Sequence, residues 1–347
     1  MAHDLELGLD TFGDVTAGPD GGLLPHAVVI RNLVEQGVLA DTVGIDFLGL
    51  GEHHRDDFAV SSPEMVLSAI AARTQRIRLG SAVTVLSSDD PIRVFQRFST
   101  LDAVSQGRAE VILGRGSFTE SFPLFGFPLS DYERLFEEKL DLFSALISRP
   151  VVSWQGSTRP PLEKQRVFPP IETGRLRTWI GVGGSPQSVV RAARYELPLM
   201  LAIIGGDPLR FRPYVDLYNR AFTQMNAPVQ PIGVHSPGHV ADTDEKARTE
   251  FWPHYLAPLQ AHARSHRRRT RLGSGGERTV RPRDRERLAS CRLAGDGGAQ
   301  DRSDRLRTRP LALPDEIQRR HPAPREHDAQ HRALRHTGRP TGQRGPE

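Results

Sequence analysis

Residues 76–118, RIRLGSAVTVLSSDDPIRVFQRFSTLDAVSQGRAEVILGRGSF, decide the fold. The segment opens with the apolar, β-branched run Ile77–Leu86, whose length suits a fully buried strand. Asp90-Pro91 offers an N-cap followed by proline at the first helical position, and apolar residues recur at helical spacing as far as Gly107. A second apolar run, Ala109–Leu113, follows. Strand, helix and strand in this order form a βαβ unit, which predicts a parallel sheet with a right-handed crossover.

The rest of the chain, up to about Tyr255, repeats this alternation. Further strands are predicted at Leu5–Phe12, Asp46–His54, Thr178–Gly184, Leu197–Ile204 and Pro231–Ala241. Helices are predicted at Leu24–Val38, Asp131–Ile147 and Thr243–Tyr255. Three further helices are predicted with one boundary each: two begin at Ser62 and at Ser185, and one ends at about Met225. The proline-rich segment Pro150–Arg177 interrupts the pattern as a surface excursion or short hairpin. Seven strands alternating with helices predict a (β/α)₈ barrel that lacks one strand, and a doubly wound sheet fits the same alternation.

The βαβ segment also resembles a known family. Its pattern is Arg-Leu-Gly-Ser-Ala at 78–82, a short polar loop, Pro91, a helix that ends near Gly107-Arg108, and a strand that closes on Arg115-Gly116. This pattern is similar to that of the bacterial luciferase-like, flavin-dependent monooxygenases, and the resemblance runs from about Leu5 to about Tyr255. It favours an α/β fold of the luciferase-like (β/α)₈ TIM-barrel type, here without the last strand and helix.

The resemblance implies an oxidoreductase that uses reduced FMN and O₂ on a small organic substrate. The reduced flavin would come from a separate flavin reductase, and relatives often form homodimers through their early helices. A deazaflavin-dependent oxidoreductase, which transfers hydride without oxygen, is the alternative within the same class. The substrate is set by loops and pocket shape rather than by strand-end motifs, so the sequence does not identify it.

Glu52-His53-His54 ends the second predicted strand. Side chains alternate along a strand, so we expect the two histidines to face opposite sides, which argues against a metal site built from both. A histidine that only hydrogen-bonds a neighbouring carboxylate inside the barrel is the plain alternative. The resemblance implicates the first histidine, His53, in the flavin–oxygen chemistry, where an imidazole with a pKa near neutrality could move protons. His54 is the second candidate.

Residues 181–188, GVGGSPQS, form the next candidate site. A strand ends in Gly183-Gly184 and a helix begins at once, with Ser185 at the N-cap position and proline after it. Free backbone N–H groups and the positive end of a helix bind anions. The same letters also open many ordinary helices, and the lysine of a Walker loop is missing. In the family, hydroxyl residues three apart hold the flavin phosphate here, and Ser185 and Ser188 match that spacing.

Two further cofactor contacts come from the resemblance. Arg115 follows a buried strand, where an arginine usually forms a surface ion pair; in the family it lies close to the flavin phosphate, and a dianion needs such a charge. The family also has a cis peptide in its third strand beneath the flavin ring. The matching position is Ala82–Val83, next to Thr84. Gly205-Gly206 and His235 also follow predicted strands and are weaker candidates.

The chain changes character after Tyr255. Residues 256–347 contain 22 Arg against 11 Asp and Glu, and they have no Lys, Phe, Trp or Tyr. The whole chain carries a net charge of +4, so residues 1–255 carry about −7, and the basic pI belongs to the tail. Such a tail cannot bury enough apolar surface to offset the entropy of ordering, so we expect it to be disordered. The composition favours out-of-frame translation of a GC-rich coding sequence, which yields Arg, Ala, Gly and Pro in place of Lys and aromatic residues.

A natural basic arm that binds nucleic acid or another acidic partner is the alternative interpretation of the tail. The acidic balance of residues 1–255 makes nucleic-acid binding the weaker functional hypothesis. No segment approaches the roughly twenty apolar residues of a membrane helix, and the start lacks the pattern of a signal peptide. A single cysteine, Cys291, rules out an intramolecular disulfide framework and suits a reducing compartment. We therefore expect a cytoplasmic enzyme.

Overall fold

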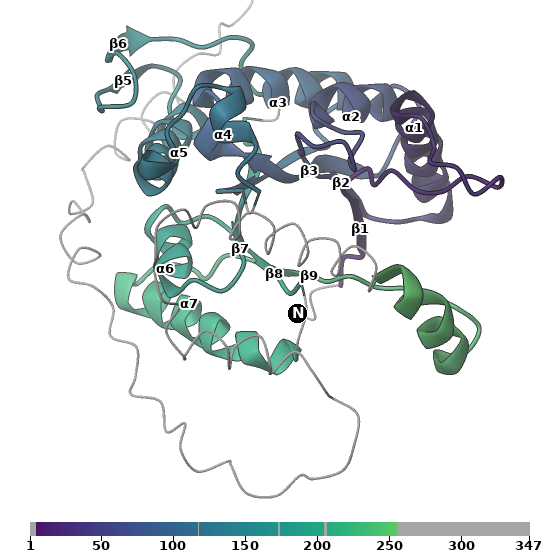
Figure 1. Ribbon diagram of the computed structural model, residues 1–347. Helices are drawn as coiled ribbons and strands as arrows, with labels where there is room; N and C mark the ends of the chain where they lie inside the picture. Colours follow the sequence, from purple (N-terminus) through teal and green to yellow (C-terminus); the bar gives the residue numbers. More distant parts are fainter. Residues whose placement is uncertain (1–4, 117, 173, 205–206, 256–347) are drawn as a thin grey trace, which may run out of the picture. The chain divides into compact units, whose positions relative to one another are not determined.

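The computed structural model describes residues 5–116, 118–172, 174–204 and 207–255 (Figure 1). The described residues divide into a first unit, which ends at His235, and a second unit, which begins at Ser236. The predicted tail, residues 256–347, lies outside the described residues.

In the first unit, seven parallel strands form one sheet in the order β1-β2-β3-β4-β7-β8-β9, which curls into a nearly closed barrel. The strands are β1 (Gly8–Thr11), β2 (Phe47–Leu50), β3 (Arg78–Val85), β4 (Ala109–Gly114), β7 (Arg177–Val182), β8 (Leu199–Ala202) and β9 (Ile232–His235). The helices are α1 (His26–Val43), α2 (Pro63–Ala71), α3 (Pro91–Ser105), α4 (Ser121–Leu124), α5 (Tyr132–Ser148), α6 (Pro186–Arg194) and α7 (Arg212–Met225). Three short 3₁₀ turns are η1 (Leu86–Ser88), η2 (Leu129–Asp131) and η3 (Pro208–Phe211). The barrel interpretation is confirmed, and the doubly wound alternative is wrong.

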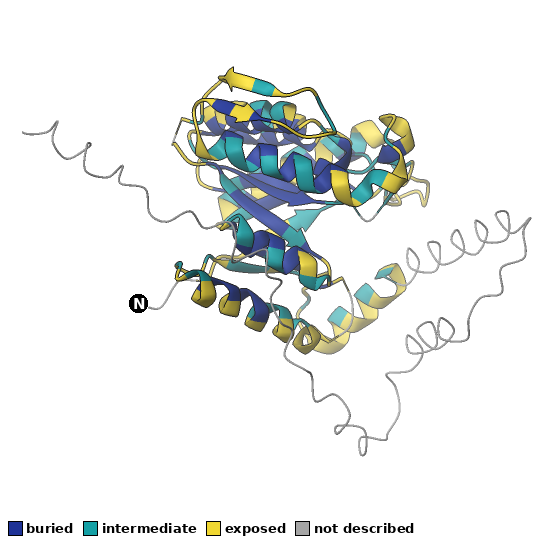
Figure 2. Ribbon diagram, turned by 90° about the vertical axis from the view of Figure 1, so that its left-hand side faces the viewer, coloured by how far each residue is buried: buried dark blue, intermediate teal, exposed yellow. Residues whose placement is uncertain are grey.

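The βαβ unit forms as predicted from β3, α3 and β4. The Asp90 carboxylate caps α3 by accepting from the backbone N–H groups of Ile92 (2.8 Å) and Arg93 (3.2 Å). Gly107, with φ +86°, ends the helix in the left-handed region that favours glycine. The buried residues concentrate in the strands and on the helix faces that cover them (Figure 2). This packing of apolar strands under amphipathic helices provides the core.

Several predicted strands are longer than the observed ones, among them Leu5–Phe12 and Leu197–Ile204, which are observed as Gly8–Thr11 and Leu199–Ala202. The strand predicted at Asp46–His54 ends at Leu50, and the one predicted at Pro231–Ala241 covers only Ile232–His235. Gly51 still donates its N–H to Thr11, but the N–H of His53 turns to the carbonyl of Val60 in the following loop. Glu52, His53 and His54 therefore lie in the loop after β2, and strand alternation does not set their directions.

The excursion predicted at Pro150–Arg177 contains a short antiparallel hairpin. Its strands are β5 (Val152–Trp154) and β6 (Leu162–Gln165), which pair outside the barrel sheet (Figure 1). The hairpin prediction is confirmed.

The strand register places one set of side chains inside the barrel. At the amino-terminal end Glu110 is buried, accepts from the Trp179 indole N–H (2.8 Å) and pairs with Arg177 (3.1 Å) and Arg78. Phe47, Ala82, Ile112, Trp179 and Met200 fill the middle. The carboxyl end carries glycines, and a methyl group at Gly114 would lie 2.5 Å from the side chain of Val83. The large side chains thus close the lower barrel and leave small residues beneath the strand ends.

The sheet has two edge strands, β1 and β9. Within the described part of the chain no backbone hydrogen bond joins them. Leu7, which precedes β1, is 59% exposed, and Leu9 on β1 and Val234 on β9 are 51% and 63% exposed. The prediction of a barrel without an eighth strand therefore agrees with the seven strands of the described residues.

The second unit is described only for residues 236–255. It contains a helix over residues 244–255, and Lys246 in the first turn pairs with Asp242 just before the helix (2.7 Å). His239 contacts Glu250 (2.7 Å), and both side chains are exposed.

Candidate functional site at the carboxyl ends of the strands

His53 lies in an aromatic cluster just beyond β2. Its ring stacks on Phe58 (centroids 4.2 Å apart) and meets the edges of Phe12 (5.2 Å) and Phe118 (5.1 Å). The Arg55 guanidinium lies over the Phe118 ring at 4.9 Å. Three aromatic rings from the β1 end, the β2 loop and the β4 loop thus surround the histidine that the sequence singled out.

This environment changes the acid–base character of His53. Burial among the rings lowers its pKa from 6.5 to about 4, although Asp57 and Glu52 oppose the shift. The expectation of a pKa near neutrality is therefore wrong, because sequence spacing does not reveal the desolvation. At neutral pH the imidazole is uncharged, so it can accept a proton or a hydrogen bond but cannot act as a cationic acid.

Glu52 and His54 pair with each other instead of joining this cluster. His54 Nε2 lies 2.9 Å from Glu52 Oε1, and the His54 ring meets the edge of Phe125. The other oxygen of Glu52 accepts the backbone N–H of Val85 at 2.9 Å. Glu52 therefore ties the loop after β2 to the end of β3. The two histidines have separate surroundings, and the described residues contain no group of three or more potential metal ligands.

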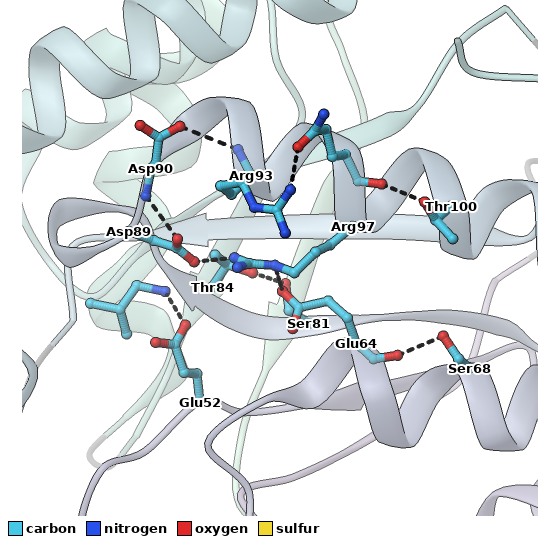
Figure 3. A network of polar contacts seen from close by, with 12 residues as sticks. Glu52, Glu64, Ser68, Ser81, Thr84, Asp89, Asp90, Arg93, Arg97 and Thr100 are labelled. Carbon is cyan, nitrogen blue, oxygen red and sulfur yellow. Dashed lines mark hydrogen bonds and ion pairs between the residues drawn. The ribbon is translucent and has the colours of Figure 1, made fainter. Parts of the chain in front are cut away.

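A buried polar network extends outward from this junction (Figure 3). Arg97 on α3 contacts Glu64 on α2 (3.1 Å) and also Asp89, which follows η1. Burial raises the pKa of both Glu64 and Asp89, and Arg97 opposes the rise. One guanidinium thus neutralises two buried carboxylates and holds α2, α3 and the end of β3 together.

The three candidates on β3 differ in what they present. The peptide between Ala82 and Val83 is cis, at the position that the resemblance implied, and the register with β4 shifts there. The Val83 side chain lies against Gly114 and Gly181 inside the barrel. Thr84 is fully buried, and its hydroxyl donates to Ser81 Oγ at 2.8 Å. Ala82 and Val83 therefore face the barrel interior, whereas the Thr84 hydroxyl is already used within the protein.

The glycine-rich turn after β7 has an open backbone. A methyl group at Gly183 would meet nothing within 4 Å, and Gly184 adopts φ +121°, which only glycine adopts without strain. Ser185 occupies the N-cap position of α6, but its hydroxyl contacts the Gln187 side chain (2.9 Å) and makes no capping bond. The predicted start of this helix is confirmed. The Ser185 hydroxyl does not accept a hydrogen bond from the free backbone N–H groups at this end.

A chain of charged contacts links Arg115 to this turn. Arg115 pairs with Glu133 on α5, and Glu133 also lies 3.5 Å from Arg191 on α6. Arg191 in turn donates to the hydroxyl of buried Ser188 at 3.3 Å and pairs with Glu137 at 2.5 Å. Arg115 and Ser188, which are 73 positions apart in the sequence, are thereby brought into one polar cluster.

Sequence reasoning missed several members of the site. Arg191 follows Ser188 by three residues, so helical spacing could have placed both on one face. Phe12, Phe58 and Phe118 carried no signal, because nothing local says that three distant rings meet at His53. A surface depression of about 220 Å³, lined by Phe95, Arg149, Arg166 and Phe168 among others, includes none of the predicted residues and lies elsewhere.

Comparison with known proteins places this geometry in context. The model of the luciferase-like monooxygenase family matches residues 11–303, beyond Tyr255, where the sequence resemblance was expected to stop. The alkanal monooxygenase alpha chain of a Kryptophanaron alfredi symbiont is 26% identical over 226 residues, which cover 65% of this chain and 62% of that protein. The chain spans less than two thirds of the length of the curated relatives that it matches.

Solved structures share the fold. The monooxygenase RslO1 from Streptomyces bottropensis has a TM-score of 0.64 and 21% identity, over 82% of both chains. The oxygenating constituent of 3,6-diketocamphane monooxygenase from Pseudomonas putida, solved in complex with FMN, has a TM-score of 0.62 and 18% identity, over 73% of this chain and 75% of that one. An F420-dependent secondary alcohol dehydrogenase has a TM-score of 0.54 and 16% identity, over 67% and 68%.

Among the residues that the structure describes, no helix is long and apolar enough to cross a membrane. The family model covers well over half of the 347 residues, and the seven-stranded barrel is the fold of the structural neighbours. The chain belongs to the luciferase-like monooxygenase family.

Proposed function

We propose that this chain is a flavin-dependent monooxygenase that binds reduced FMN at the carboxyl ends of β4 and β7 and acts with O₂ on a small organic molecule. The observation that carries the proposal is the polar cluster at these strand ends. It combines Arg115, Ser188 and Arg191 with the open turn at Gly183-Gly184 and the amino-terminal end of α6. Two arginines, a hydroxyl and a helix end are the partners that a phosphate dianion prefers.

The residues present fit this group. Gly183 leaves the backbone open, and the conformation of Gly184 holds the turn in place. Arg191 is buried and already bonded to Ser188, so its orientation is set before any ligand arrives. Glu133 accepts from Arg115 and must share or release that arginine when a phosphate binds. The site therefore selects a group with more negative charge than a single carboxylate.

The aromatic cluster around His53 suits an organic substrate and a proton acceptor. The rings of Phe12, Phe58 and Phe118 are partly exposed around the uncharged His53. When bound, reduced FMN supplies the electrons that activate O₂. His53 then accepts a proton or a hydrogen bond at an oxygen atom near the ring cluster, and the aromatic rings keep water from it.

Comparing FMN with riboflavin tests the phosphate site. Each charge-assisted hydrogen bond contributes about 1.5–3 kcal/mol, so Arg115→Ala or Ser185→Ala should weaken FMN binding about tenfold or more and change riboflavin binding little. Binding is measured by quenching of flavin fluorescence. Arg134→Ala, which removes an exposed arginine paired with Asp131, is the control and should change neither affinity. Equal losses for both ligands would place the phosphate elsewhere.

The cofactor and its supply complete the proposal. The barrel is shared with FMN- and F420-dependent proteins, so reduced deazaflavin is the alternative ligand. Anaerobic titration of the chain with each reduced cofactor distinguishes the two, and tight binding of only the deazaflavin would make it the proposed cofactor in place of FMN.

We further propose that a separate cytoplasmic reductase supplies the reduced flavin and that the chain forms a homodimer. Turnover that depends on an added reductase, and a sedimentation coefficient of a dimer, are the expected results.

A further inference from the structure

A second histidine lies at the carboxyl ends of the strands, on the two edge strands of the barrel. His235 is the last residue of β9, and Asp10 lies on β1, 225 positions away. Asp10 Oδ2 contacts His235 Nδ1, and both side chains are largely buried, with 14% and 17% exposed. No role for this pair follows from the phosphate site or from His53.

Local packing fixes the Asp10 carboxylate. Its Oδ1 occupies the space above Gly49, where a methyl group would lie only 2.1 Å away. Because a carboxylate can only accept, the single N–H hydrogen of a neutral His235 imidazole lies on Nδ1, and in this tautomer Nε2 carries the lone pair. Within the described part of the chain, no residue forms a hydrogen bond with that Nε2.

The ring of Phe12 connects this pair to the aromatic cluster. Its centroid lies 6.0 Å from the His235 ring and 5.2 Å from the His53 ring. Gly51 allows this position, since a methyl group there would lie 2.5 Å from Phe12. His235 and His53 are therefore both neighbours of the Phe12 ring, which also lies 6.4 Å from the ring of Phe58.

We propose that Asp10 and His235 form the polar end of the substrate site, which binds an apolar, ring-containing molecule through a hydroxyl group that donates to His235 Nε2. The aromatic rings match an apolar body. A lone pair on Nε2 requires a donor, and the Asp10 carboxylate disfavours an anionic group. The inference rests on the proposed function in so far as the bound molecule is the substrate of the monooxygenase. Asp10 acts as a positioning residue, because it holds the imidazole in the tautomer that accepts.

The pair also has a structural alternative. The ends of β1 and β9 lack backbone hydrogen bonds to each other, so Asp10 and His235 could serve only to tie the two edges of the barrel. A tie would change stability but would not distinguish ligands with and without a hydroxyl. Ligand preference therefore separates the two roles.

The experiment compares 4-methylphenol with 4-methylanisole, which has the same ring but no O–H donor. Saturation-transfer NMR on the full chain gives both dissociation constants, and thermal melting gives the stability of each variant. We expect the wild type to bind the phenol about five- to tenfold more tightly, the range of one neutral hydrogen bond. His235→Phe should reduce this ratio to about 1. Asp10→Asn can keep the tie to the histidine but no longer imposes its tautomer, so the ratio should fall at least about threefold with little change in melting temperature.

His239→Phe is the matched control, because His239 pairs with Glu250 in an exposed position. It should leave the ratio unchanged. Two results would overturn the proposal in favour of a purely structural contact between β1 and β9. One is an unchanged ratio of the two dissociation constants in His235→Phe and Asp10→Asn, and the other is a wild type that does not prefer the phenol. The assay contains no flavin, so FMN binding is measured separately. Failure to bind FMN with the phenol preference intact would refute the flavin proposal and leave the hydroxyl site standing.

Discussion

At the scale of single residues, the surroundings of His53 decide what it can do. An imidazole stacked on Phe58 and edged by Phe12 and Phe118 loses much of its hydration, and its pKa falls to about 4. The protein thus keeps an uncharged base among apolar rings at neutral pH. In this neutral form the ring accepts a hydrogen bond or a proton, and its lowered pKa makes it a weaker base than a free imidazole.

The shifted pKa of His53 predicts how stability depends on pH. The unfolded histidine takes up a proton below about pH 6.5, whereas the folded one does so only near pH 4, so proton binding favours the unfolded chain. Stability contributed by the neutral form is present above pH 6.5 and is lost between pH 6.5 and 4, by about 3 kcal/mol at most. His53→Phe should flatten the decline of melting temperature over this range. The exposed His26→Phe should not, and parallel curves for wild type and His53→Phe would contradict the pKa.

At the scale of secondary-structure elements, Arg97 holds a junction that supports the site. It joins Glu64 on α2 to Asp89 at the start of α3, next to Glu52 and the end of β3 (Figure 3). The two carboxylates are largely buried, so each depends on this one guanidinium. The loop that carries His53 is held by the same junction through Glu52.

We expect Arg97→Gln to destabilise the fold by roughly 2–4 kcal/mol at pH 7, because it leaves two buried carboxylates without their cation. The loss should shrink as the pH falls, since burial raises the pKa of Glu64 and Asp89 and both then protonate. Urea denaturation at several pH values measures this. Arg73→Gln removes an exposed, bidentate pair with Glu35 and should cause no resolvable loss. Equal effects of the two substitutions would contradict the role given to Arg97.

At the scale of the whole molecule, the barrel of the first unit is open between β1 and β9 as far as the described residues show. Among these residues each edge strand has a ladder on one side only, and Leu9, Val234 and Leu7, which precedes β1, are exposed there. Unpaired strand edges favour local opening and association with other chains. The interpretation of residues 256–347 as an out-of-frame or disordered tail remains a prediction.

Hydrogen–deuterium exchange should therefore be uneven around the sheet. We expect amides of β1 and β9 to exchange at least about tenfold faster than those of β3 and β4, which have neighbours on both sides. Mass spectrometry of peptic fragments provides the rates. Removal of residues 256–347 should leave this difference unchanged. Equal protection of all four strands in the full chain would mean that a further segment pairs with the open edges.

Local chemistry in the sequence was enough to determine the alternation of strands and helices. Asp90-Pro91 and Ser185-Pro186 start helices because caps and proline act within one turn, and apolar runs such as Ala109–Leu113 become strands wherever they lie. Parallel strands bring their carboxyl ends to one rim, so the positions of His53, Arg115 and Ser185 could be predicted as strand ends.

Only the tertiary structure decided what surrounds those residues. The desolvation of His53 comes from Phe118, the orientation of Ser188 from Arg191 and the carboxylates of α5, and the position of His235 from Asp10. Apart from the bond between Ser188 and Arg191, these contacts join positions 54 to 225 residues apart, and no local pattern encodes them. Electrostatic free energies and pKa values depend on distances and burial in three dimensions, so the sequence determined where the chemistry lies while the fold decided its charge state and its partners.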